Sequence, residues 1–188
     1  MRIQSHVLLL FGLAVLPLIA DARAGEFKLE PGFTLLFNGK NLDGWQTAKV
    51  KKSEPLQGKT EAFKGRFKVE DGKLIYDPKA GGDRYIETVK EFAKDIHFKF
   101  DFKPGPACNN DILFRGKKFD IIPGKGETKN VKEGEWYTFE LVAVGDKIEH
   151  KIDGDTVRTT KNVKAIPSAF MLRAEFGAIQ IKNIRAKE

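Results

Sequence analysis

The strongest pattern in the chain is the run Asp95-Ile96-His97-Phe98-Lys99-Phe100-Asp101-Phe102-Lys103, in which even positions are apolar and odd positions are polar or charged. A period of two is typical of a β-strand with one face in a core and the other in water. The alternation resumes at 111–115 and 118–122, after a segment rich in Gly, Pro and Asn. The stretch 94–123 therefore predicts three half-buried strands.

If these three strands are neighbours in one sheet, their polar side chains share one charged surface. The expected members of that surface are Lys99, Asp101, Asp111, Arg115, Lys118 and Asp120. An antiparallel sheet can leave one face in water, so such a surface costs the fold little. We therefore expect a functional site there.

The rest of the chain repeats the strand pattern between turn signals. Arg66–Val69 and Lys73–Tyr76 flank Glu70-Asp71-Gly72, which is a strong hairpin signal. Further strands are expected at 33–37, 85–89, 136–144, 147–152, 156–160, 170–174 and 178–184. About a dozen short strands without alternating helices predict an all-β fold, an antiparallel sandwich or barrel.

The first 24 residues have the features of a secretory signal peptide. Arg2 supplies a positive start, Val7–Ala20 is apolar, and Ala22-Arg23-Ala24 fits the small-x-small cleavage pattern. A membrane anchor is the alternative, but the apolar run is shorter than the roughly 20 residues that a spanning helix needs. We expect cleavage after Ala24 and a secreted or periplasmic protein.

The remaining chain, Gly25–Glu188, has a length that suits one domain. The whole sequence carries a formal net charge of +7 at pH 7, but no basic run contains interleaved aromatic residues. We therefore expect a solvated lysine-rich surface, no nucleic-acid partner and no membrane span. A single cysteine, Cys108, allows no internal disulfide, so the core must supply the stability.

The segment from Gly32 to Trp45, Gly-Phe-Thr-Leu-Leu-Phe-Asn-Gly-Lys-Asn-Leu-Asp-Gly-Trp, resembles the opening of the 3-keto-disaccharide hydrolase family, whose members include 3-keto-glucoside 1,2-lyase/hydratase-like proteins. The similarity continues in family order at residues 69–74, 109–115, 134–138, 150–154 and 181–185. The resemblance implies a concanavalin-like jelly-roll sandwich. It also implies a carbohydrate partner, a glycoside oxidised at the sugar C3, cleaved by hydrolysis or by 1,2-elimination and hydration.

The chain departs from the family pattern at four motifs, one of which is the Asn-Gly turn, where Asp153 replaces the Asn. Asn109-Asn110-Asp111 replaces Asn-Ser-Gly, and Asp120-Ile121-Ile122 stands where the family has Glu-x-Gln, which keeps an acid and loses the amide. Leu172-Arg173-Ala174-Glu175-Phe176 stands where the family has Leu-Gln-x-His-Gly, so both Gln and His are replaced. His150 matches a family histidine.

Cleavage of a 3-keto-glycoside needs a base for the acidified C2 proton, donors that stabilise the enolate, and an acid for the leaving group. We predict Asp120 as the base, Arg115 and Lys118 as the enolate clamp and His150 as the acid, with Glu175 as a competing base. The expected substrate-binding residues are Asp111, Lys118, Arg173 and Trp136.

Each assignment has a structural alternative. Asp120 and Arg115 could form a surface ion pair of little energetic value. His150 lies between Ile148 and Ile152 at a period of two and could face the core. Trp136 could likewise be a packing residue.

No cofactor is expected, and the spacing of His97 and His150 does not support a zinc site. A hard cation held by oxygen ligands stays open. Three functions from different classes remain: an exported enzyme that acts on 3-keto-glycosides, a non-catalytic carbohydrate-binding sandwich, and an extracellular interaction domain. The family resemblance favours the first, whereas the loss of Gln and His favours the second. The oligomeric state has no signal in the sequence.

Overall fold

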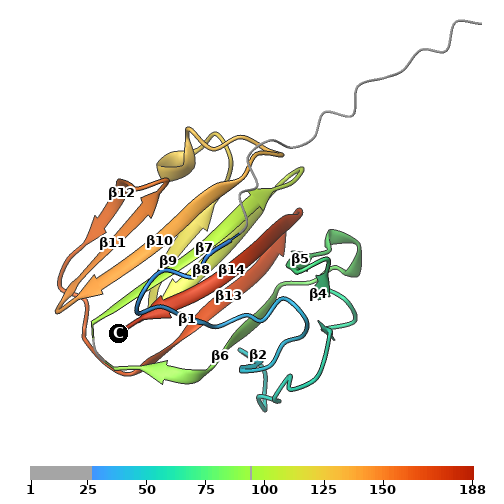
Figure 1. The fold of residues 1–188 in the computed structure, drawn as a ribbon. Helices are drawn as coiled ribbons and strands as arrows, with labels where there is room; N and C mark the ends of the chain where they lie inside the picture. The colour runs from blue at the N-terminus through green and yellow to red at the C-terminus, as the bar shows by residue number, and fades with distance from the viewer. Residues whose placement is uncertain (1–26, 94) are drawn as a thin grey trace, which may run out of the picture.

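The computed structural model describes residues 27–93 and 95–188, so the predicted signal peptide at Met1–Ala24 lies outside the described residues. Two antiparallel sheets face each other across one hydrophobic core (Figure 1). Within the described part, helical structure is limited to two short 3-10 turns, η1 (Pro78–Ala80) and η2 (Gly126–Thr128). None of the described residues forms a helix long and apolar enough to cross a membrane.

One sheet has nine strands, of which eight follow one another in space. Their order is β12 (Asp155–Thr160), β11 (Lys147–Ile152), β10 (Tyr137–Val144), β7 (Ile96–Pro104), β14 (Ile179–Lys187), β5 (Lys73–Tyr76), β4 (Phe67–Glu70) and β3 (Glu61–Ala62). The ninth, β1 (Thr34–Leu35), pairs with β14. Figure 1 shows β11, β10, β7 and β14 side by side.

The second sheet has five strands. Their order is β2 (Trp45–Ala48), β6 (Arg84–Phe92), β13 (Ser168–Phe176), β8 (Asn109–Phe114) and β9 (Lys117–Ile121). The all-β antiparallel sandwich predicted from the sequence is therefore confirmed. β2 and β3 fall outside the predicted strands.

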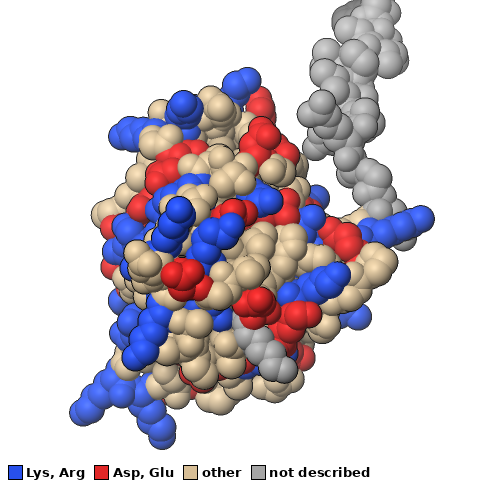
Figure 2. All heavy atoms as spheres, turned by 90° about the vertical axis from the view of Figure 1, so that its left-hand side faces the viewer, with Lys and Arg blue, Asp and Glu red and all other residues tan. Residues whose placement is uncertain are grey.

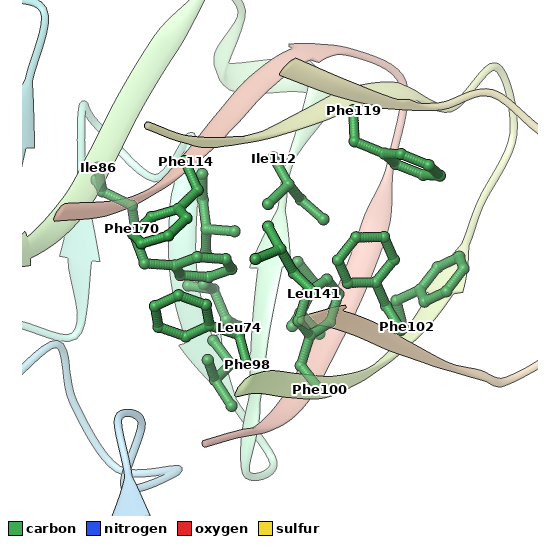
Figure 3. Packing of buried hydrophobic residues seen from close by; sticks show 14 of the residues in the cluster. Leu74, Ile86, Phe98, Phe100, Phe102, Ile112, Phe114, Phe119, Leu141 and Phe170 are labelled. Atoms are coloured by element: carbon green, nitrogen blue, oxygen red, sulfur yellow. The ribbon is translucent and has the colours of Figure 1, made fainter. Parts of the chain in front are cut away.

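The strict alternation in β7 has the predicted effect. Phe98, Phe100 and Phe102 are fully buried, while the residues between them lie on the outer side. Phe98 stacks on Phe170 of β13, with ring centroids 4.5 Å apart, so this contact joins the two sheets. In Figure 3 the labelled rings from both sheets point toward one another. Burial of each such side chain contributes roughly 1.5–3 kcal/mol.

The prediction that β7, β8 and β9 could share one sheet is wrong. β7 belongs to the nine-stranded sheet, and β8 and β9 belong to the other. The physical reason is the segment Pro104-Gly105-Pro106, because proline cannot donate to a strand ladder and the chain crosses there to the second sheet. Lys99 and Asp101 therefore lie on the outer face opposite to that of β8 and β9.

The charges are interspersed where the β11–β12 side of the molecule faces the viewer (Figure 2). Lys and Arg side chains alternate there with Asp and Glu, and the ion pairs include Lys147–Glu149 at 2.8 Å and Arg158–Glu127 at 3.5 Å. On this face the net positive charge is not gathered into one basic patch, which agrees with the expected solvated surface.

Candidate functional site

A row of polar side chains crosses the outer face of the five-stranded sheet. Tyr85 on β6 lies opposite Arg173 on β13, and Arg173 lies opposite Asp111 on β8. Asp111 in turn lies opposite Asp120 on β9. Because side chains alternate along a strand, the neighbours of these residues fill the core instead: Ile86, Leu172, Ile112 and Phe119. We call Tyr85, Arg173, Asp111 and Asp120, with Lys118, Glu175 and Asp83 beside them, the charged row.

Arg173 is the centre of the charged row. Its Nε and Nη2 donate to the two carboxylate oxygens of Asp83 at 2.9 and 2.8 Å. Its Nη1 lies 2.5 Å from Asp111 Oδ2 and 2.9 Å from Glu175 Oε2. The hydrogen bond to Asp83, and then that to Asp111, raise the pKa of Arg173 well above its usual range. Three carboxylates therefore fix the orientation of this planar guanidinium.

Asp111 and Asp120 form a coupled carboxyl pair beside Lys118. The side chain of Asp111 is fully buried, and among the described residues its Oδ1 has no hydrogen-bond partner. Burial first, and Asp120 next, raise the pKa of Asp111 to about 6 although Arg173 acts against this. Burial also opposes the charge on Asp120, but the contacts with Asp111 and Lys118 lower its pKa overall. Two facing carboxyls of this kind hold one proton between them more easily than none.

Lys118 and Asp120 are members of the charged row that a ligand can reach from solvent. The side chains of Lys118 and Asp120 are 46% and 35% exposed, and Lys118 Nζ lies 2.5 Å from Asp120 Oδ1. Glu175 and Arg173 are less open, at 20% and 15%. A substrate on this face can therefore touch Asp120 and Lys118 directly. Asp111 is buried and acts only through its contact with Asp120.

Arg115 does not lie with Asp120, and the prediction that the two share a face is wrong. Arg115 begins the two-residue turn between β8 and β9, with a φ of 47°. Such tight hairpins require positive φ values, so the strand alternation ends at Phe114. The Arg115 guanidinium then donates to the carbonyl oxygens of Gly145 and Ala93 at 3.4 and 3.5 Å.

His150 also lies away from the charged row. It is 1% exposed and stacks on Phe119 between the two sheets, with ring centroids 4.8 Å apart. Burial first, and then the charge of Arg158, lower the pKa of His150 to about 3. Asp120 follows Phe119 in β9 and points to the other side of the sheet, so His150 does not lie on the charged face where it was predicted as the acid. The structure shows the core alternative.

Trp136 lies on the opposite sheet. It precedes β10, and its ring is 4.2 Å from Lys182 Nζ and 5.3 Å from Lys103 Nζ, both on strands of the nine-stranded sheet. Trp136 was predicted as a substrate contact from its residue type, and it does not belong to the charged row, because β10 and β9 lie in different sheets. The charged row keeps five predicted residues: Asp111, Lys118, Asp120, Arg173 and Glu175.

Several residues at the site escaped the sequence reasoning. Tyr85 could have been found, since it alternates with the buried Ile86 in a predicted strand. Asp83 precedes that strand and carries no periodic signal.

A cleft of 400 Å³ lies at the Asp83–Glu175 end of the charged row, lined by Arg66, Pro78, Gly81, Gly82, Asp83, Glu175, Phe176 and Gly177. Among the described residues, no group of three or more His, Cys, Asp or Glu side chains is arranged to hold a metal ion.

Comparison with solved structures shows the same fold in carbohydrate-related proteins. A candidate glycosyl hydrolase from Parabacteroides distasonis ATCC 8503 is 19% identical, with a TM-score of 0.65 over 83% of this chain and 93% of that one. The β-glucanase of Bacillus licheniformis is 10% identical, with a TM-score of 0.53 over 83% of this chain and 97% of that one. The carbohydrate-binding module CBM66 from Bacillus subtilis is 13% identical, with a TM-score of 0.52 over 78% and 96%.

Among curated protein sequences, none matches the chain. The family model of the 3-keto-alpha-glucoside-1,2-lyase-like domain matches residues 32–131, which include β8, β9 and the Asp111–Asp120 pair. The match spans more than half of the sequence, and the fold agrees with what the opening motif at 32–45 implied. The chain therefore belongs to the 3-keto-alpha-glucoside-1,2-lyase-like domain family.

Proposed function

We propose that the charged row cleaves glycosides that are oxidised at C3 of the sugar. The observation that carries this proposal is an accessible carboxylate, Asp120, in contact with a cation, Lys118, and with a buried carboxyl, Asp111, whose pKa is raised to about 6. Family membership and the carbohydrate-related structures of the same fold support a sugar substrate.

Asp120 acts as the general base in this proposal. A ketone at C3 acidifies the hydrogen on C2, and Asp120 takes that proton while the electron pair of the C2–H bond moves toward the C3 oxygen. Around and below pH 6, the proton held by Asp111 keeps the carboxyl pair from carrying two full charges. Glu175, which is 20% exposed, is the competing base.

Lys118 keeps the role of enolate clamp, which the sequence predicted for Lys118 and Arg115 together. The ammonium of Lys118 is the most exposed cation beside Asp120, so it can turn from the carboxylate toward the negative C3 oxygen as the enolate forms. Arg173 supports the site by holding Asp111 and Glu175 in place.

The leaving group needs a proton source on the same face. After the first step Asp120 carries the proton from C2, and it returns this proton to the glycosidic oxygen as the C1–O bond breaks. The enolate electrons form the C1–C2 double bond and the C3 ketone is restored. Addition of water across that double bond then gives the free 3-keto sugar, so the sum of elimination and hydration is hydrolysis.

A carbohydrate-binding role without catalysis is the second candidate. The observation that favours it is the engagement of Arg173 by three carboxylates, which is a rigid arrangement suited to recognition.

We also propose export after cleavage behind Ala24. Mass spectrometry of the exported protein should give the mass of a chain that begins at Gly25, and the mass of a chain that begins at Met1 would contradict the proposal.

The test is incubation of the chain with a 3-keto-glucoside that bears a chromogenic aglycone. We expect release of the aglycone with the keto substrate and none with the corresponding unoxidised glucoside, because only the ketone acidifies C2. Saturable binding of both sugars without release would favour the second candidate over the enzyme.

A further inference from the structure

The cleft at the Asp83–Glu175 end of the charged row has the features of a built sugar site. Its 400 Å³ falls within the range of about 300–1,000 Å³ that is usual for small-molecule pockets. It shares Asp83 and Glu175 with the charged row, so a ligand in the cleft would continue directly onto the proposed reaction face.

Arg66 supplies a buried donor in the wall of the cleft. The residue is only 1% exposed, and its Nε donates to the carbonyl oxygen of Gly82 at 3.2 Å. Its Nη1 is buried and has no hydrogen-bond partner within the described part of the chain. A buried guanidinium hydrogen without an acceptor is costly, and an oxygen atom of a bound ligand would satisfy it.

Phe176 supplies an exposed aromatic ring at the same cleft. Its side chain is 61% exposed, the largest value among the exposed large hydrophobic residues of 27–93 and 95–188. The next residue, Gly177, has a φ of 64° and lies against the backbone of Ala107, so the end of β13 is fixed in this position. A rigid, open aromatic ring is a suitable platform for the apolar face of a sugar ring.

The charges at the cleft select for a neutral ligand. Asp83 and Glu175 line it and can accept hydrogen bonds from hydroxyl groups. Arg173 pairs with both, but Asp111 and Asp120 add further acid nearby. Arg66 lines the cleft and Arg84 lies against Gly82, so cations there offset the carboxylates. A hydroxyl-rich neutral ligand matches both the acceptors and the donor without adding a charge.

We propose that this cleft is a subsite for one neutral hexose ring of the glycan, with Phe176 as its stacking platform and Arg66 as its buried donor. The proposal rests on the proposed function only in placing the reacting sugar at the charged row. Binding in the cleft itself requires no turnover, so the two can fail separately.

The probe is trehalose, which lacks the ketone and so cannot enter the proposed elimination. Titration of the isotope-labelled chain should shift the Nε–H signal of Arg66 and the amides of Gly82 and Phe176. The Phe176→Ala variant should bind trehalose at least about tenfold more weakly, which corresponds to about 1.4 kcal/mol. Trp136→Ala is the matched control, because it removes an aromatic ring from the opposite sheet and should leave the affinity unchanged.

Three results would overturn the subsite: loss of binding in Trp136→Ala but not in Phe176→Ala, no saturable shift at Arg66, or tighter binding of glucuronate than of glucose. Because Arg66 is read by its own signal, the test needs no variant at this buried position. Trehalose binding that depends on Phe176 without any cleavage of 3-keto-glycosides would support the subsite and contradict the enzyme. Cleavage of a 3-keto-glycoside with the same KM in Phe176→Ala as in the unchanged protein would support the enzyme and contradict the subsite.

Discussion

Asp111 and Asp120 lie directly opposite each other on β8 and β9, yet only Asp120 reaches solvent. The fold thus separates two carboxyl groups of the same kind into a buried partner and an accessible one. The buried carboxyl has its pKa raised to about 6, and the accessible one has its pKa lowered. Environments that push the pKa values of neighbouring groups apart are typical of sites that move protons.

The coupling of this pair can be measured by titration. Carbon NMR of the aspartate carboxyl groups should show Asp111 titrating near pH 6. In Asp120→Asn its pKa should fall toward the ordinary value, because the neighbouring carboxyl that raises it is gone. Arg173→Gln should move the pKa of Asp111 in the opposite direction, since Arg173 lowers it. An unchanged Asp111 titration in both variants would contradict the coupling.

The conformation at Gly177 is fixed by a close backbone approach. A Cβ at this position would lie 2.1 Å from Ala107 O, and the φ of 64° is in the left-handed region. Gly72 also has a positive φ, of 74°, but its Cβ would meet nothing within 4 Å. Urea unfolding should show a loss of about 1–2 kcal/mol for Gly72→Ala, from backbone strain alone. Gly177→Ala should cost at least about 2 kcal/mol more, and equal losses would show that the backbone at Ala107 yields.

The burial of His150 makes the stability sensitive to acid. Its pKa is lowered to about 3 in the folded state, against about 6.5 when unfolded, so the unfolded chain binds the extra proton between these values. The free energy of unfolding should therefore fall by up to about 1.4 kcal/mol per pH unit as the pH drops from 6 toward 4. His150→Phe keeps an aromatic ring against Phe119 and removes this proton, so the variant should lose less stability over the same range. A parallel loss in both proteins would contradict a buried neutral histidine.

The period-two patterns predicted most strands and the buried faces, because alternation in β7, β8 and β9 reports which side of each strand is apolar. What the patterns cannot report is which strands pair. β7 and β8 have matching alternation, but the crossing at Pro104-Gly105-Pro106 puts them in different sheets. The expected surface was therefore split into two outer faces.

The same limit explains which site residues were found. Asp111 and Asp120 lie inside regular strands, so alternation placed them on one side, whereas Arg173 was identified from the family motif at 172–176. Strand pairing brings the three together. Arg115 lies one residue past β8, where the turn conformation, not the pattern, sets the direction of its side chain. Arg66 lies just before β4, and its unpaired buried nitrogen is visible only in the packed structure.

The identity of the base gives the sharpest test of the proposed chemistry. Asp120 is the accessible carboxylate of the coupled pair, so Asp120→Asn should lower kcat on a 3-keto-glucoside by at least about a hundredfold. The fold should be kept, because the side chain is 35% exposed and its replacement has the same shape. Lys118→Met should also lower kcat, because it removes the charge that would face the enolate, while KM changes less.

Glu175 is the rival, since its carboxylate faces both Arg173 and the cleft. If Asp120 is the base, Glu175→Gln should mainly raise KM, because it then only accepts hydrogen bonds from the sugar or orients Arg173. Arg173→Lys separates these effects further, since a point charge cannot hold Asp83 and Asp111 with the geometry of a planar guanidinium. Replacing the true base by its amide should abolish turnover, because an amide cannot take the C2 proton. A tenfold or smaller loss of kcat in Asp120→Asn, beside near-complete loss in Glu175→Gln, would therefore contradict Asp120 as the base. The proton transfer would then take place at the end of β13 and not at the β8–β9 hairpin.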